Sequence, residues 1–596
     1  MKVLLIGINA KYIHSNPAIY SLKAYADKYY PLRPDNCVLE IAEYTINQSS
    51  SAILADIYQK RPQVAAFSCY IWNWNLIQEL LAELPKLLSE TQLWLGGPEV
   101  SFDAEKIMRT FPQLTGIMVG EGEETFLELL HYYWEQTIPL STVKGIVYKN
   151  GFTGERTLTD IDKLPFLYCP NSSTNTTNIF APFKNRILYY ESQRGCPFQC
   201  AYCLSAIDKT VRLRDLNTVK SELQSFLDCQ VPQVKFIDRT FNCNQVHALF
   251  IWQYLLENDN GITNFHFEIA ADLLTAKQIE LLRNMRPGLI QLEIGVQSTN
   301  KTTLESINRH TNLEALRQNV AQIHSFQNIH QHLDLIAGLP YEDYDSFIHS
   351  FNEVYAMAPD QLQLGFLKVL KGSPIEQRAE EYGLVYQSKP PYEVLYTKWL
   401  CYEELLKLKG IAELVEIYYN SNQFSYTLSV LQDEFASPFH LFAALTDYYH
   451  TNGYFISTPS KNYRYQILLE FACSIAADKR DLYIELLTFD LYLRENLKSR
   501  PNFSPENKIN RQQLNKFYAQ EEQTPNYLQG YCGYTSAQLL RMTHIECFFY
   551  PVWKEQAKDR TQKRQTPAYI LFDYQRRSPL THNAAFYEVI LKTQIE

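Results

Sequence analysis

Three cysteines, Cys196, Cys200 and Cys203, lie within one short segment with C-x3-C-x2-C spacing. Thiolates this close along a chain can all reach one metal centre. A structural zinc ion would need a fourth Cys or His at comparable spacing, and none follows in the next few residues. A [4Fe–4S] cluster is normally held by four Cys, so a cluster held by three keeps one iron open. The spacing therefore predicts a cluster that takes part in chemistry, with a zinc knuckle or unrelated thiols as the alternative.

The same spacing, with an aromatic residue before the last Cys, resembles the signature of the radical S-adenosylmethionine enzymes. Tyr202 occupies the aromatic position, which in that family lies near the adenine. The resemblance implies that the open iron chelates S-adenosylmethionine and that one electron from the reduced cluster yields a 5′-deoxyadenosyl radical. It also implies an electron donor such as flavodoxin or ferredoxin.

The elements that must position this motif follow it along the chain. Short apolar runs alternate with helical patterns, as a partial parallel β/α barrel requires. Functional side chains are expected at the carboxyl ends of such strands. The barrel domain is expected over residues 185–374, with strands at 234–237, 265–269, 289–294 and 332–336.

Sequence around these strands is similar to the oxygen-independent coproporphyrinogen oxidases of the same superfamily, in the runs 295–298, 308–309 and 334–340. Carboxylates and an amide can bind ribose hydroxyls and an ammonium group, while arginine can take a carboxylate. Asp238 ends a strand where the superfamily often carries a Gly-Gly-Glu-like segment, from which this sequence departs. The alternative for each residue is a barrel-end polar side chain without a ligand. The resemblance implies S-adenosylmethionine contacts from Tyr202, Asp238, Glu268, Gln297, Arg309 and Asp334.

The first 140 residues predict a second α/β unit, a doubly wound Rossmann-like sheet. Buried parallel strands are expected at 2–7, 64–68, 93–97 and 117–120, with helices between them. Ligands of such sheets bind beyond the carboxyl ends of the strands, where glycines let the backbone approach a large ligand. No G-x-G-x-x-G follows the first strand, which disfavours a dinucleotide site.

The strand-end segments 96–99 and 120–124 resemble the cobalamin-binding domain of cobalamin-dependent radical enzymes. A D-x-H-x-x-G motif, which in other cobalamin proteins supplies a cobalt-binding His, is absent. His14 is therefore expected to line the site without ligating cobalt. A flavodoxin-like domain with an empty or structural role is the alternative. The cobalamin contacts implied by the resemblance are Asn9, His14, Ser68, Tyr70, Gly96, Gly97, Glu99, Gly120, Glu121 and Gly122.

The rest of the chain carries no motif with evident chemistry. A hairpin at 145–151 and a polar run at 171–178 are expected within a connecting region, 141–184. Residues 375–596 predict a mostly helical domain, including one long helix over 392–420. It resembles an uncharacterised domain attached to cobalamin-type radical enzymes. From its position we expect it to cover the open barrel and shape the substrate pocket.

Composition restricts the partners and the cellular compartment that are expected for this chain. The net charge of −10 over 596 residues disfavours broad nucleic-acid binding. The 12 cysteines are mostly unpatterned, which indicates a reducing compartment. No signal peptide is expected, and no apolar run approaches the roughly 20 residues that span a bilayer. The chain is therefore predicted to be cytoplasmic and to contact no membrane.

These resemblances predict a cobalamin-dependent radical enzyme, most simply a methyltransferase acting on an unactivated carbon. Two alternatives stay open: a radical rearrangement or cyclisation on the same cofactors, and a cobalamin or metal sensor without turnover. Radical methylthiolation of transfer RNA is disfavoured, because those enzymes carry a different N-terminal domain. The sequence names neither the substrate nor a catalytic residue.

Overall fold

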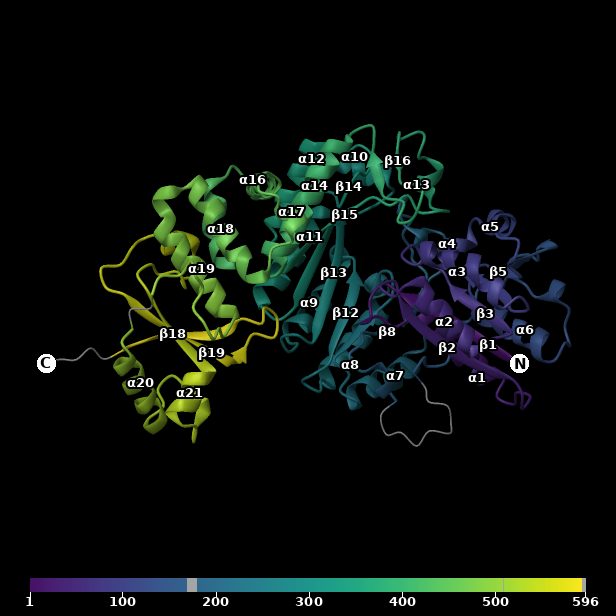
Figure 1. Cartoon of the computed structure of the whole chain (residues 1–596), viewed down its shortest axis with the longest axis horizontal. Coiled ribbons are helices and arrows are strands. Elements are labelled where there is room, and N and C mark those ends of the chain that lie inside the picture. Colours follow the sequence, from purple (N-terminus) through teal and green to yellow (C-terminus); the bar gives the residue numbers. More distant parts are fainter. Residues whose placement is uncertain (169–178, 507–508, 592–596) are drawn as a thin grey trace.

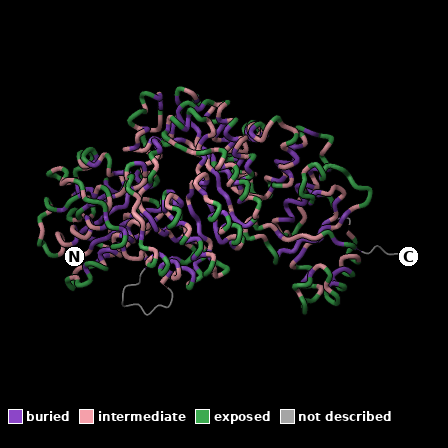
Figure 2. Tube along the Cα trace, turned by 180° about the vertical axis from the view of Figure 1, so that it is seen from behind, coloured by how far each residue is buried: buried purple, intermediate pink, exposed green. Residues whose placement is uncertain are grey.

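The computed structural model describes residues 1–168, 179–506 and 509–591, so the polar run at 171–178 lies outside it. Figure 1 shows an N-terminal sheet in purple and blue, a central sheet in teal, and a mainly helical region in green and yellow beyond it. Strands of both sheets run through the buried interior, and exposed residues concentrate on the outer helices and loops (Figure 2). The predicted α/β fold class is confirmed.

The N-terminal sheet has the strand order β2-β1-β3-β4-β5-β6-β7. Strands β1 to β5 are parallel, and β6 and β7 add the predicted antiparallel hairpin. The edge strand β2 was absent from the prediction, because Glu40 and Glu43 interrupt its apolar pattern. The strand bounds are β1 Lys2–Asn9, β2 Val38–Thr45, β3 Val64–Ser68, β4 Gln92–Gly96, β5 Gly116–Met118, β6 Ile146–Tyr148 and β7 Gly151–Phe152.

Helices cover both faces of this sheet, which explains why its central strands are apolar throughout. All five residues of β3 are buried. One face packs under α1 (Pro17–Tyr29) and α6 (Glu123–Trp134). The other packs under α2 (Ser50–Lys60), α3 (Trp74–Leu87) and α5 (Ala104–Thr110). The carboxyl ends of the strands remain free for a ligand.

The central sheet has six parallel strands in the order β15-β14-β13-β12-β11-β8. Burial alternates strictly along β13: its apolar residues pack outward on helices, while Gln291, Glu293 and Gln297 belong to the opposite face. The four predicted strands are present, and β15 is an additional one. The strand bounds are β8 Leu188–Tyr190, β11 Gln233–Phe236, β12 Asn264–Ile269, β13 Ile290–Gln297, β14 His330–Ala337 and β15 Gln361–Phe366.

The C-terminal region begins with helices that pack on the edge of the central sheet. The Asn420 side chain accepts from the Leu362 backbone N–H and donates to the Leu362 carbonyl, both at 2.9 Å, so it pairs with edge strand β15 as a further strand would. The helices are α14 Tyr402–Leu414, α16 Pro438–Thr451, α18 Lys461–Ile475 and α19 Arg480–Arg494. A three-stranded antiparallel sheet follows, made of β18 Thr543–Phe548, β19 Ala568–Arg577 and β20 Ala584–Val589.

The prediction of one long helix over 392–420 was wrong at its beginning. Residues Val394–Tyr396 form strand β17, and α14 starts only at Tyr402. Glu404 accepts a hydrogen bond from the Cys401 backbone N–H at 2.8 Å, which caps the helix at that point. Among the described helices, none combines the length and the apolar character needed to cross a bilayer.

A buried ion pair joins the central sheet to the segment that connects it with the N-terminal unit. Arg214 lies 2.5 Å from Glu222, and their side chains are 5% and 9% exposed. The same guanidinium donates to the carbonyls of Ile161 and Leu164 at 3.0 and 2.8 Å. Arg214 therefore holds the connecting segment against α7 (Leu216–Asp228).

Replacing Arg214 with Met should leave Glu222 buried without its partner charge. We expect the apparent free energy of unfolding to fall by about 3–5 kcal/mol, because an uncompensated buried charge is costly. The double variant Arg214→Met/Glu222→Leu should regain most of that loss. Urea unfolding followed by intrinsic fluorescence measures both.

The matched control is Arg283→Met, whose pair with Glu280 is more than half exposed and is worth at most about 1 kcal/mol. An Arg214→Met variant as stable as this control would contradict the assignment.

Candidate functional site

Two cavities meet between the N-terminal and central sheets. The larger, about 510 Å³, lies beyond the carboxyl ends of the N-terminal strands. The smaller, about 260 Å³, lies at the carboxyl ends of β12, β13 and β14. Ser205 and Arg239 line both. A ligand in one cavity therefore adjoins a ligand in the other.

All three cysteines of the motif line the smaller cavity. Their loop is fixed by backbone contacts, since the N–H of Ala201 donates to Ile307 and that of Ile375 donates to Ala201. Gly195 has φ +95°, and a Cβ there would lie 2.3 Å from the Thr210 carbonyl oxygen, so only glycine fits before Cys196.

The three thiols are not spaced as the ligands of a single metal ion would be. Among the described residues, no three Cys, His, Asp or Glu side chains converge closely enough to hold one ion. A four-iron cluster takes one thiolate on each of its ligated irons, so its ligands stand further apart. Burial raises the pKa of Cys196. The Arg309 guanidinium donates to Cys200 Sγ at 3.6 Å. The donor set fits a cluster.

The candidate S-adenosylmethionine contacts Tyr202, Glu268, Gln297, Arg309 and Asp334 line the same cavity as the cysteines. Within the described chain, Arg309 Nε and Asp334 Oδ1 are buried without a hydrogen bond. Asp334 Oδ1 lies 3.1 Å from His332 Nε2, but without the alignment that a hydrogen bond needs. Buried polar atoms are normally paired, so an orphan donor and an orphan acceptor in one cavity fit a polar ligand.

Asp238 does not line either cavity, although it was expected to contact the cofactor. Its side chain is fully buried. Its carboxylate accepts from the Ser192 N–H at 2.9 Å, the Ser192 hydroxyl at 2.5 Å and the Gln193 N–H at 3.1 Å. Burial raises the pKa of Asp238 to about 8. The residue ties β11 to the segment after β8, and its neighbours Arg239 and Thr240 line the smaller cavity instead.

Glu293 is a cavity residue that sequence reasoning missed. Its Oε2 lies 2.9 Å from both Lys235 Nζ and His266 Nε2. Burial opposes ionisation, but the adjacent His266 imidazole and the Lys235 charge hold the pKa of Glu293 below its ordinary value. Burial and the Glu293 charge together raise the pKa of Glu268. The signal was available, because the period of two in β13 assigns Glu293 and Gln297 to one face.

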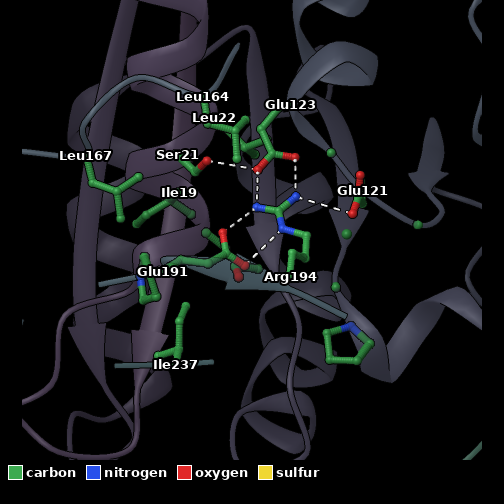
Figure 3. A pocket seen from close by; sticks show the side chains of 18 of the residues that line it. Ile19, Ser21, Leu22, Glu121, Glu123, Leu164, Leu167, Glu191, Arg194 and Ile237 are labelled. Carbon is green, nitrogen blue, oxygen red and sulfur yellow. Dashed lines mark hydrogen bonds and ion pairs between the residues drawn. The ribbon is translucent and has the colours of Figure 1, made fainter. Parts of the chain in front are cut away.

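Most of the candidate cobalamin contacts line the larger cavity. This cavity continues between the N-terminal sheet, at Leu5, Ala66 and Met118, and helix α1, at Ile19 and Leu22 (Figure 3). Gly120 has φ +80°, and a Cβ added there would meet nothing within 4 Å, so its backbone borders open space. That fits close approach of a large ligand. The candidate contacts that line it are Ser68, Tyr70, Gly96, Gly97, Gly120, Glu121 and Gly122.

Asn9, His14 and Glu99 were expected at the cobalamin site, but they do not line the cavity. Asn9 donates to Glu43 at 2.9 Å. His14 Nδ1 lies 2.6 Å from the Tyr189 hydroxyl, on strand β8. Glu99 is buried and accepts from Lys371 at 3.0 Å and from the Tyr392 hydroxyl. His14 thus contacts strand β8 of the central sheet, whereas Glu99 contacts the segment that follows β15.

An ionic network crosses from the central sheet to the N-terminal sheet along one wall of the larger cavity (Figure 3). Arg194 donates to Glu191 at 2.8 Å and to Glu123 at 3.0 Å, and it lies 3.4 Å from Glu121. Glu121 also lies 2.6 Å from Arg212, so this carboxylate is occupied by protein cations. Burial alone would raise the pKa of Glu123, but the charge and hydrogen bonds of Arg194 keep it below its ordinary value.

The C-terminal region was expected to shape the substrate pocket, and this was wrong for both cavities. Neither cavity is lined by a described residue beyond Asp334. The region instead covers the β15 edge of the central sheet, through Asn420 and through the hydrogen bond from the Tyr419 hydroxyl to the Pro359 carbonyl at 2.6 Å.

Comparison with known proteins identifies each part of the chain. The family model of the B12 binding domain matches residues 3–130, and that of the radical SAM superfamily matches residues 190–354. Residues 380–572 match a protein family of unknown function, DUF4080. The first two matches confirm the predicted cofactor classes: cobalamin, and S-adenosylmethionine with a [4Fe–4S] cluster.

Curated relatives match about half of the chain. The cobalamin-dependent radical SAM methyltransferase TokK of Streptomyces tokunonensis is 24% identical over 54% of this chain and 50% of its own length. The anaerobic magnesium-protoporphyrin IX monomethyl ester cyclase of Rubrivivax gelatinosus is 23% identical over 45% and 48%. The chain thus spans about half the length of the curated relatives it matches.

Solved structures agree with the fold. The cobalamin-dependent S-adenosylmethionine radical enzyme OxsB, with aqua-cobalamin bound, has a TM-score of 0.56 at 15% identity, over 82% of this chain and 80% of that one. The radical S-adenosylmethionine methyltransferase TsrM from Kitasatospora setae has a TM-score of 0.53 at 15% identity, over 66% and 78%. The chain thus combines a B12-binding domain with a radical SAM domain, and a match to DUF4080 follows them.

Proposed function

We propose that this chain is a cobalamin-dependent radical S-adenosylmethionine methyltransferase that acts on an unactivated carbon. The observation that carries the proposal is that the cysteine-lined cavity and the cavity beyond the N-terminal strands share Ser205 and Arg239. When bound, the cluster and S-adenosylmethionine supply a 5′-deoxyadenosyl radical, and cobalamin supplies the methyl group. A carbon that depends on both must lie where the cavities meet.

In the smaller cavity, each candidate residue has a role that its chemistry suits. Cys196, Cys200 and Cys203 would hold the cluster. The Arg309 guanidinium, whose Nε is buried and unpaired, would bind the carboxylate of S-adenosylmethionine. Glu268 and Asp334 would accept from ribose hydroxyls or the ammonium group. Burial raises the pKa of Asp334, so a bound donor would stabilise the ionised carboxylate.

In the larger cavity, the strand-end glycines would let the corrin approach the backbone. His14 Nδ1 is engaged with Tyr189, so we infer that no protein nitrogen ligates cobalt. The Arg194 network beside the cavity holds the N-terminal sheet and the cysteine loop at one separation. Its residues would keep the two cofactors in a fixed relation and restrict the entry of water.

Replacing Cys196, Cys200 and Cys203 together with Ala should abolish the cluster, because these thiols are its proposed ligands. The anaerobically purified variant should lose its visible absorbance and its bound iron, measured by ultraviolet–visible spectroscopy and iron analysis. The control is Cys243→Ala, since Cys243 is partly buried but lines neither cavity. A full complement of cluster iron in the triple variant would sink the ligand assignment.

Replacing Ala18 with Trp should block the larger cavity, because Ala18 of α1 lines it. We expect cobalamin affinity to fall by at least about tenfold, or ~1.4 kcal/mol, in equilibrium binding. The control is Ala24→Trp, on the same helix, half-buried and away from the cavity. Equal affinity in both variants would refute the location of the site.

Nitrogen superhyperfine splitting in the Co(II) paramagnetic resonance spectrum of wild-type protein would refute the absence of a nitrogen ligand.

The reaction type is decided by product mass. The reconstituted protein, given methyl-deuterated S-adenosylmethionine, a reductant and a cell extract, should produce a compound that carries the labelled methyl group. A rearrangement or cyclisation would transfer no label. A sensor would release no 5′-deoxyadenosine under the same conditions. Formation of 5′-deoxyadenosine without any labelled product would therefore exclude methyl transfer in favour of the second reaction type.

A further inference from the structure

Arg239 stands where the two cavities adjoin, which is where the proposed function places the substrate. It follows strand β11, and it lines both the larger and the smaller cavity. Its neighbours Asp238 and Thr240 are buried, at 0% and 8% exposure, whereas Arg239 is exposed. The backbone is thus fixed by Asp238, while Arg239 itself is exposed and lines both cavities.

The other arginines that line the two cavities are already paired. Arg194 binds Glu191 and Glu123, and Arg214 binds Glu222. Arg309 donates to the Gly295 carbonyl and to Cys200. Arg239, in contrast, has a guanidinium that makes no hydrogen bond or ion pair with any residue the structure describes. Its five N–H donors form a planar fork that matches a carboxylate or a phosphate.

The charge of Arg239 reaches into both cavities. Burial raises the pKa of Tyr70, in the larger cavity, and the Arg239 charge opposes that rise. Burial likewise raises the pKa of Glu268, in the smaller cavity, and Arg239 again opposes it. The Arg239 guanidinium therefore lies within electrostatic range of residues in both cavities.

The cofactor carboxylate does not need this cation. In the smaller cavity Arg309 carries a buried, unpaired Nε for that purpose. A cofactor ammonium group would be repelled by Arg239, so the residue does not replace the acidic segment that the superfamily often carries after this strand. The Arg239 guanidinium therefore remains available to bind a third molecule, the substrate.

We propose that Arg239 binds an oxoanion of the substrate, and hence that the substrate is an organic carboxylate or phosphate. This rests on the proposed function, which requires a substrate at the junction of the cavities. The fork would fix one end of the substrate by two parallel hydrogen bonds. Its reacting carbon would then lie at a constant distance from both cofactors.

The first test separates extract components by charge. A cell extract is passed over an anion exchanger, and retained and unretained fractions are each given to reconstituted holoenzyme with methyl-deuterated S-adenosylmethionine. Labelled product should arise only from the retained fraction. With Arg239→Gln, product formation at limiting substrate should fall about ten- to a hundredfold, as expected for loss of a hydrogen-bonded ion pair. Arg283→Gln, an exposed arginine away from both cavities, is the control.

Two results of this test would overturn the proposal. One is labelled product from the unretained fraction alone. The other is a tenfold or greater loss of S-adenosylmethionine or cobalamin affinity in Arg239→Gln, which would make Arg239 a cofactor ligand. Affinities within about twofold of wild type, together with loss of product, support the substrate role.

A second measurement does not depend on turnover. Holoenzyme is heated with succinate or inorganic phosphate, against chloride at equal ionic strength. An ion that binds the native state raises the midpoint of unfolding. We expect one of the two oxoanions to stabilise wild type and Arg283→Gln but not Arg239→Gln, and which one does so distinguishes a carboxylate from a phosphate. Equal shifts in all three proteins would refute the site.

If no fraction gives labelled product, the proposed methyl transfer fails, and this measurement still decides whether Arg239 binds an anion.

Discussion

The buried contact between Arg194 and Glu123 is the interaction on which the arrangement of the two cofactor sites depends. Arg194 lies two residues before Cys196, and Glu123 begins helix α6 of the N-terminal unit. Removing both charges from water is costly, and they compensate each other only when the two units are docked. Undocking would separate Glu123 from Arg194, which would keep Glu191 as its partner. The same contact that closes the larger cavity therefore also sets its distance from the cysteine loop.

The concave face of the central sheet is polar where a closed barrel would be filled with apolar side chains. Glu293 is held by Lys235 and His266, and Asp334 lies against His332. Glu293 and Asp334, which line the smaller cavity, thus each have a basic side chain beside them within the sheet. This arrangement lets carboxylates face a ligand without leaving unpaired charge in the interior.

The sequence predicted best what depends on neighbours along the chain. The cysteine spacing, the apolar strands and the strand-end glycines are local, and the structure brings their residues to two adjoining cavities. His14 and Glu99 lie outside the lining of the larger cavity because they contact Tyr189 and Lys371, which are far away in sequence. Asp238 points away from both cavities for a similar reason, because its carboxylate accepts hydrogen bonds from the backbone of Ser192 and Gln193. A shift of one position separates the buried anchor from the cavity residue Arg239.

The DUF4080 region supports the fold, and none of its described residues lines either cavity. Asn420 pairs with the exposed backbone of β15, which protects an edge that would otherwise be open to pairing with another chain. Within the described chain, the linings of both cavities end at Asp334. A substrate confined to those cavities is therefore selected by residues of the first two domains. Arg239 falls inside the radical SAM domain, at a position that lines both cavities. A substrate large enough to reach the DUF4080 region must extend out of the cavities to do so.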